Sequence, residues 1–162
     1  MERAYDQAKY GEFSHRPYID MVIPTLTDPS VAPPGKHVLS CFVQYAPYAP
    51  EGGWQVQKPK FLDAVPGVLE AHAPGLRASV LAAELSTPAD LEREFRMSGG
   101  HWHHGDLAFD QFYMVRPVPG AAQHATPVAG LYLCGASCHP GGGVMGVAGR
   151  NAARRVLAEV GR

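Results

Sequence analysis

The sequence predicts an α+β fold, with a mixed, mostly antiparallel sheet and flanking helices. Short runs of β-branched and apolar residues alternate with stretches whose apolar residues recur at helical spacing. The 18 glycines and 15 prolines interrupt the chain at short intervals, which favours short elements joined by defined turns. Hydrophobic residues make up 46% of the 162 residues and charged residues 18%, so the chain has enough apolar side chains to form a core.

The N-terminal part is expected to form a weakly indicated helix over residues 1–10 and then a β-hairpin. Residues 18–23 are rich in β-branched and apolar types and stop at Pro24, which is typical of a strand. Residues 37–45 predict a second strand, apolar on both faces and therefore central in its sheet. Residues 27–36 are dense in turn formers, so we expect the two strands to pair antiparallel with a long connection.

A loop that carries Trp54 is expected over residues 47–59, followed by a helix that ends near residues 73–75. Proline lacks the backbone N–H that a helix interior needs, so Pro66 is expected to kink or restart this helix. The apolar and ring residues at helical spacing are Phe61, Val65, Val68, Leu69 and His72.

Residues 76–85 predict a third strand, and a short helix is expected after it. Thr87 matches an N-cap residue, Pro88 the first helical position and Asp90 the acidic position of a capping box. This second helix is expected to run through Phe95.

The C-terminal part contains the most informative segment. After a loop of rings and glycines at residues 98–106, residues 131–134 predict a short apolar strand and residues 135–143 a glycine-rich turn. From Val144 onward, small and apolar residues repeat at three- and four-residue spacing, which predicts an amphipathic helix. The order strand, glycine-rich turn, helix is typical of an element that faces a phosphate or a cofactor.

Residues 141–146 formally satisfy the pattern G-x-G-x-x-G between a strand and a helix. A dinucleotide-binding unit also needs a second strand and an acidic residue about 20 residues further on, and neither is present. This is therefore not the primary nucleotide-binding turn. Two interpretations stay open: a turn that approaches a cofactor, and a tight turn with close helix–strand packing.

Cysteine and histidine side chains suggest a metal site, but their spacing argues against one. Cys134 and Cys138 are separated by three residues rather than the usual two, and Cys134 is expected to be a buried small hydrophobe in its strand. We assign no metal ligand and keep a small Cys/His metal-binding domain as an alternative. The histidines available to such a site are His101, His103, His104 and His139.

Charge and hydropathy exclude several classes. The formal net charge is −1 and the basic residues are scattered, which argues against nucleic-acid binding. No apolar run in the chain is long enough to span a membrane, and its polar N-terminal residues lead us to expect no secretory signal. Three cysteines at irregular spacing do not form a disulfide framework, so we expect a cytoplasmic protein.

Several segments resemble one family of oxidoreductases. Residues 131–136, 139–146 and 149–153 resemble the C-terminal flavin-binding motif of phytoene-dehydrogenase-like FAD-dependent oxidoreductases. The similar branch contains carotenoid isomerases and the pyridine nucleotide-disulphide oxidoreductase domain-containing proteins. Further segments resemble this branch in the same order: residues 23–30, 32–37, 45–48, 87–92, 99–105 and 116–117.

The resemblance implies that residues 1–126 are part of a substrate domain and that residues 127–162 complete an FAD-binding domain. It implies that Gly135 and Ala136 approach the ribityl or pyrophosphate part of FAD. The residues implied to face the flavin ring are Gly142, Gly143, Val144, Met145 and Gly146. A helix N-terminus there would stabilise the negative charge that hydride transfer leaves near N1 of the flavin.

The same resemblance implies two-electron chemistry of the desaturase, dehydrogenase or isomerase type on an apolar or conjugated small molecule. The loop and turn residues Trp102, His104 and His139 are weaker candidates for lining the substrate. No catalytic acid or base is assigned, because the flavin carries the reaction.

Taken alone, the chain is expected to be inactive and to bind FAD weakly, because it lacks the glycine fingerprint and the ribose-binding acid. Its expected partner is an N-terminal FAD-binding half or a separate chain that supplies it. Residues 131–134 and the helix face at Val156 and Val160 are expected to be under-buried and to favour a homodimer. A redox-inactive module that binds a ligand or a partner stays open as an alternative.

Overall fold

The computed structural model describes residues 1–105, 108–111 and 113–161. The chain divides into two compact units, Met1–Asp90 and Leu91–Arg162. Each unit contains helices, and the first also contains a small antiparallel sheet, so the predicted α+β class is confirmed. The assignment of residues 1–126 and 127–162 to a substrate domain and an FAD-binding domain stays a prediction.

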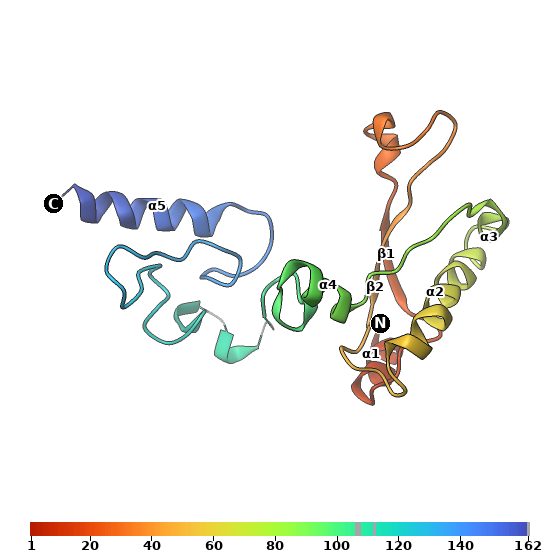
Figure 1. Ribbon diagram of the computed structural model, residues 1–162, viewed down its shortest axis with the longest axis horizontal. Coiled ribbons are helices and arrows are strands. Elements are labelled where there is room, and N and C mark those ends of the chain that lie inside the picture. Colours follow the sequence, from red (N-terminus) through yellow and green to blue (C-terminus); the bar gives the residue numbers. More distant parts are fainter. Residues whose placement is uncertain (106–107, 112, 162) are drawn as a thin grey trace. The chain divides into compact units, whose positions relative to one another are not determined.

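The first unit is built around a β-hairpin. Strand β1 (Tyr18–Val22) pairs antiparallel with β2 (Ser40–Gln44), as predicted. The long connection contains two single-turn 3-10 helices, η1 (Pro24–Leu26) and η2 (Pro29–Val31), at the far end of the hairpin (Figure 1). The prediction that the second strand is central is wrong. The described sheet has only these two strands, and Phe42 on β2 is exposed.

The first unit also contains three helices, α1 (Glu2–Lys9), α2 (Trp54–Glu70) and α3 (Leu76–Ser79). Helix α2 begins at Trp54 rather than after the expected loop, and it contains both Pro59 and Pro66 without a restart. The third strand predicted over residues 76–85 is wrong, because α3 occupies its start and the rest is extended but unpaired.

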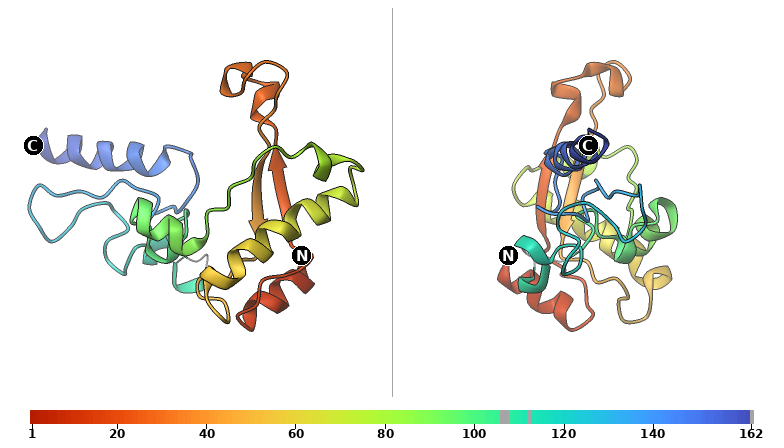
Figure 2. Two further views of the ribbon diagram at one scale, coloured as in Figure 1. Left: turned by 45° about the vertical axis from the view of Figure 1, so that its right-hand side comes forward. Right: turned by 90° about the vertical axis from the view of Figure 1, so that its left-hand side faces the viewer.

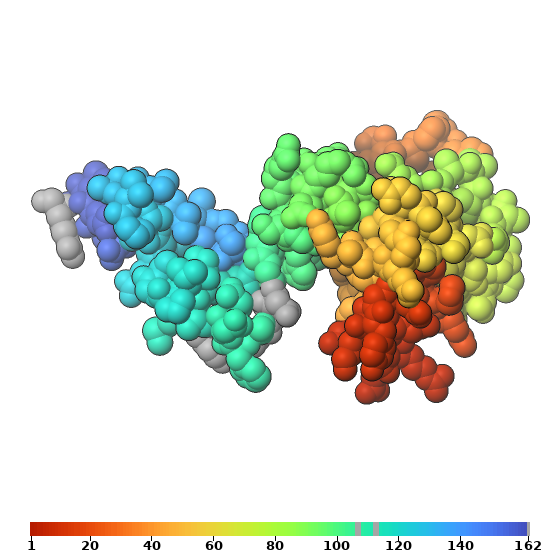
Figure 3. Space-filling view, turned by 60° about the horizontal axis from the view of Figure 1, so that its bottom comes forward, coloured from red at the N-terminus to blue at the C-terminus, as the bar shows by residue number. Residues whose placement is uncertain are grey.

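Aromatic packing holds α2 in place despite its two prolines. Phe61 on α2 is 1% exposed, and its ring lies 4.9 Å from that of Phe13 and 5.9 Å from that of Trp54, measured between centroids. Val65 and Leu69 continue the same buried face. The space-filling view shows the N-terminal segment (red) against α2 (yellow) (Figure 3). Burial of this face offsets the hydrogen bonds that prolines remove, since tertiary packing supplies most helix stability in proteins.

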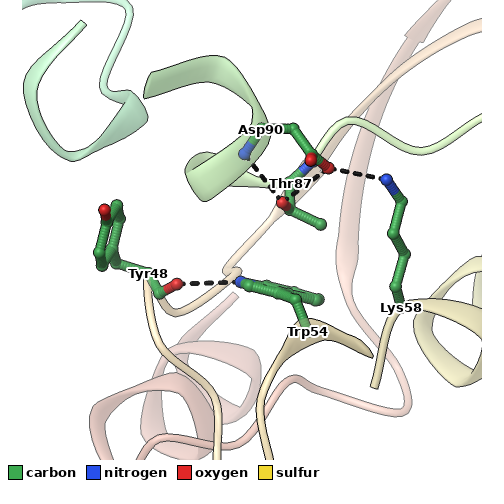
Figure 4. A network of polar contacts seen from close by, with 5 residues as sticks. All are labelled: Tyr48, Trp54, Lys58, Thr87 and Asp90. Atoms are coloured by element: carbon green, nitrogen blue, oxygen red, sulfur yellow. Dashed lines mark hydrogen bonds and ion pairs between the residues drawn. The ribbon is translucent and has the colours of Figure 1, made fainter. Parts of the chain in front are cut away.

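Helix α4 (Pro88–Phe95) has the predicted N-terminal cap. The Thr87 hydroxyl accepts a hydrogen bond from the Asp90 N–H at 3.1 Å, and the Asp90 carboxylate accepts one from the Thr87 N–H at 3.1 Å. Lys58 on α2 forms a 2.7 Å ion pair with the same carboxylate (Figure 4). The cap therefore also ties the start of α4 to α2.

The second unit consists mostly of loops followed by one long helix, α5 (Val147–Val160) (Figure 2). Short 3-10 turns precede it at Ser98–Gly100 (η3), Phe109–Gln111 (η4) and Tyr113–Val115 (η5). No helix among the described residues is long and apolar enough to cross a membrane.

The strand predicted over residues 131–134 is wrong, because only an isolated bridge between Ala125 and Tyr132 forms. The buried His124 ring contacts the Leu133 carbonyl through Nδ1 at 3.0 Å and supports this bridge. A strand needs a neighbour to satisfy its backbone groups, and the described part of the second unit offers none beyond this bridge. Helix α5 forms as predicted but begins at Val147 rather than Val144.

We predict that Thr87→Ala lowers the free energy of unfolding of the first unit by about 1–2 kcal/mol, because it removes the N-cap hydroxyl. Urea unfolding followed by Trp54 fluorescence in a Trp102→Phe background measures this change. Thr87→Ser keeps the hydroxyl and is expected to lose less. Equal losses in the two variants would show that the hydroxyl contributes nothing.

Candidate functional site

A small cavity of about 70 Å³ lies between the glycine-rich turn and the start of α5. The predicted cofactor-binding residues that line it are Gly135, Ala136, Gly143, Met145 and Gly146. The cavity wall also contains Cys134, Gly141 and the first turn of α5. Two predicted residues are not part of this lining: Val144 is fully exposed, and Gly142 packs against another loop.

The N-terminus of α5 makes this cavity favourable for a group with negative charge. The Arg150 N–H donates to the Gly146 carbonyl at 3.0 Å, which closes the first turn of the helix. The N–H groups of Val147, Ala148 and Gly149 therefore have no acceptor within the helix, and these residues line the cavity. Gly146 has φ +67°, a left-handed conformation that glycine adopts without strain. The helix dipole adds partial positive charge at the same end.

The predicted substrate-lining residues fall in two loops. Trp102 is 50% exposed and His104 is exposed, both in the loop over residues 101–105, whereas His139 is half-buried in the glycine-rich turn. The His103 ring lies 5.7 Å from the His101 ring and 5.6 Å from the Trp102 ring, between centroids. The loop is thus a small cluster of aromatic rings. Contact of these residues with a substrate stays a prediction.

His103 joins this loop to the glycine-rich turn. A Cβ atom added to Gly142 would lie 2.7 Å from both the Cβ and the Nδ1 of His103. Real Cβ atoms do not approach other atoms so closely, so only glycine fits at this position without movement. The side of Gly142 that faces the loop is therefore closed by the imidazole.

Arg116 is a further site residue, which the sequence analysis included only in a segment that resembles the family, residues 116–117, and not among the site residues. Its side chain is 1% exposed, and its Nη2 donates to the carbonyl oxygens of His103 at 2.7 Å and His104 at 3.2 Å. Its guanidinium also packs against Gly105 and Gly141, whose added Cβ atoms would lie 3.6 Å from it. One signal in the sequence could have found it: a lone charge inside the apolar run at residues 112–119.

The described residues give no support to the metal-binding alternative. No three His, Cys, Asp or Glu side chains among them come together as metal ligands. Cys138 is 1% exposed, whereas Cys134 is exposed, so the expectation of a buried Cys134 is wrong. Cys134 loses its burial because the strand to which it was assigned does not form. Partial burial raises the pKa of the Cys41 thiol, which makes it less nucleophilic.

Comparison with curated proteins finds relatives along nearly the whole chain. Pyridine nucleotide-disulfide oxidoreductase domain-containing protein 2 of Mus musculus is 50% identical over 163 residues, which cover 99% of this chain and 28% of the relative. Prolycopene isomerase 2, chloroplastic, of an Oncidium hybrid cultivar is 34% identical, covering 88% of this chain and 25% of the relative. Phytoene desaturase (lycopene-forming) of Pseudescherichia vulneris is 33% identical, covering 76% and 25%.

These relatives confirm the resemblance on which the sequence interpretation relied. The chain spans about a quarter of the length of the relatives it matches. No protein-family model and no solved structure matches it.

We predict that Gly142→Ala destabilises the second unit by about 1–3 kcal/mol, because the new methyl group overlaps the His103 side chain. Urea unfolding followed by Trp102 fluorescence in a Trp54→Phe background measures the loss. The matched control is Gly149→Ala, where a Cβ meets nothing within 4 Å and a helical alanine should be neutral or stabilising.

His103→Gly removes both atoms that the new methyl group would meet. The penalty for Gly142→Ala should therefore shrink in the double variant, with a coupling energy of about 1 kcal/mol or more. Additive effects of the two substitutions would contradict the contact.

Proposed function

Because the chain is a relative of oxidoreductase, desaturase and isomerase proteins along most of its length, we propose that it is the C-terminal part of an FAD-dependent oxidoreductase. The substrate class we propose is an apolar, unsaturated small molecule, as the names phytoene desaturase and prolycopene isomerase indicate for those relatives. FAD supplies two-electron redox chemistry when it is bound.

The cavity at the start of α5 is the observation that carries this proposal. Its donors are backbone N–H groups at a helix N-terminus, which suit the electronegative pyrimidine edge of a flavin. Glycines at positions 135, 141, 143 and 146 leave the backbone open to close approach. The residues present therefore fit one edge of the cofactor.

The size of the cavity supports the second part of the proposal, that the chain does not hold FAD tightly by itself. Its volume is about 70 Å³, whereas pockets for whole ligands measure roughly 300–1,000 Å³. A cavity of this size accommodates a single group rather than the whole cofactor. The adenosine and pyrophosphate then need a further portion of protein, consistent with relatives about four times as long as this chain.

Exposed apolar side chains in the second unit give this further portion a surface to cover. Leu131 and Leu133 are 51% and 36% exposed, and Val160 on α5 is 79% exposed, whereas Val156 is half-buried. Exposed apolar side chains that gather in one patch mark a surface for another protein or domain. We propose that the FAD-binding portion covers them, with a second copy of this chain as the alternative occupant.

In this proposal the chain's own residues orient the flavin and the substrate, and they transfer no protons. The N–H groups of the first α5 turn stabilise negative charge in the cavity, and the ring cluster over residues 101–105 offers aromatic faces to an unsaturated substrate. No side chain of the site is assigned as a catalytic acid or base.

The test is an FAD titration of two proteins, followed by flavin absorbance and fluorescence. The first is this chain alone, and the second is a hybrid in which the chain replaces the matching segment of the Mus musculus relative. We expect weak or no binding by the chain, and stoichiometric binding by the hybrid and by the unmodified relative.

A colourless hybrid beside a yellow unmodified relative would contradict the proposal and favour a redox-inactive binding module. Tight binding by the chain alone would show that it builds a complete flavin site, which the small cavity argues against. If the unmodified relative is also colourless, the assignment of FAD itself is wrong.

A further inference from the structure

Arg116 combines two properties that the proposed function does not use. It is one of the most completely buried side chains in the described part of the protein, and its Nε and Nη1 atoms have no hydrogen-bond partner among the described residues. Only Nη2 is engaged, by the carbonyls of His103 and His104. A guanidinium carries its charge at any physiological pH, so this cation is buried with no described carboxylate to neutralise it.

The position of Arg116 connects it to the cavity. Gly141 is shared by both: it lines the cavity, and an added Cβ would lie 3.6 Å from Nη1 of Arg116. Gly141 is buried and has φ +114°, a conformation essentially restricted to glycine. One residue of backbone therefore separates the buried charge from the cavity. At this depth in the protein the charge is poorly screened by water.

Arg116 also holds the neighbouring loop in an unfavourable conformation. His104 has φ +55°, which is rare for a residue with a side chain, and its carbonyl is one of the two that Arg116 binds. The carbonyl of His103 is the other, and the His103 ring closes over Gly142. The guanidinium thus fixes the loop over residues 101–105 against the glycine-rich turn from behind.

We propose that Arg116 is a positioning residue of the flavin site, whose buried charge makes the cavity favour a ligand group that gains negative charge. This inference rests on the proposed function. The group is the pyrimidine edge of the flavin, and the partial positive charge of the α5 N-terminus acts on it in the same direction. Arg116 therefore raises the midpoint potential of the bound flavin, because it stabilises the reduced form more than the oxidised form.

The test is a redox titration of the hybrid protein with reference dyes, with three variants. Arg116→Gln removes the charge, and Arg116→Lys keeps the charge but cannot hold two carbonyls in a planar fork. Arg154→Gln, an exposed arginine on α5, is the matched control for the loss of one charge.

We expect Arg116→Gln to weaken the binding of reduced relative to oxidised flavin at least tenfold, which lowers the two-electron midpoint potential by about 30 mV. Arg116→Lys should change this ratio less than threefold, and Arg154→Gln should leave it unchanged. A midpoint potential in Arg116→Gln equal to that of the unmodified hybrid would overturn the proposal. So would equal shifts in Arg116→Gln and Arg154→Gln.

A second measurement needs no folded Arg116→Gln variant. In the hybrid with isotope-labelled arginine, the Nε–H resonance of Arg116, identified by its absence in Arg116→Lys, is expected to shift when the flavin is reduced. An unchanged resonance would contradict the proposal.

Two results separate this inference from its premise. If the unmodified hybrid binds no FAD, the proposed function fails before Arg116 is tested. If the unmodified hybrid binds FAD but Arg116→Gln leaves its midpoint potential unchanged, the inference fails while the proposed function stands.

Discussion

The buried guanidinium of Arg116 is the constraint on which the second unit depends. That unit has one long helix and few paired backbone segments, so its loops have little regular structure to hold them. Arg116 supplies a fixed point, because it binds two carbonyls of the loop over residues 101–105 and packs against Gly105 and Gly141. A buried charge is costly, and it persists where the surrounding groups or a ligand compensate for it. The glycine-rich turn packs against this arrangement at Gly141 and Gly142.

The first unit also depends on side-chain contacts between segments that are far apart in sequence. A hairpin of two five-residue strands is marginally stable by itself, and the unit around it is held by the aromatic cluster of Phe13, Trp54 and Phe61, which packs the N-terminal segment against α2. Large apolar side chains remain exposed on and beyond the hairpin, among them Val22 and Leu26. Exposed apolar residues in both units are consistent with relatives about four times as long, in which further structure would cover these surfaces.

Elements with a complete local signal were predictable from the sequence, and elements that need a distant partner were not. Thr87 and Asp90 predict the α4 cap, and two β-rich runs around a turn segment predict the hairpin. The strands expected over residues 76–85 and 131–134 have apolar sequences, but the described residues offer them no neighbouring strand beyond the single bridge at Tyr132. The restart expected at Pro66 does not occur, because burial of one helix face outweighs a missing hydrogen bond. At the site, the cavity residues around Gly143 follow from the motif, whereas Arg116 and the contact between His103 and Gly142 join segments far apart in sequence.

The contact between the His103 ring and Gly142 tests this account most directly, because it exists only if the loop and the turn are locked together. Nuclear Overhauser effects between the imidazole protons of His103 and the α-protons of Gly142, measured on the isolated chain in solution, report this contact without any ligand. The account predicts a strong cross-peak that is lost in Arg116→Gln. Absence of the cross-peak in the unmodified chain would show that the loop and the turn are independent, and the role of Arg116 as their fixed point would be wrong.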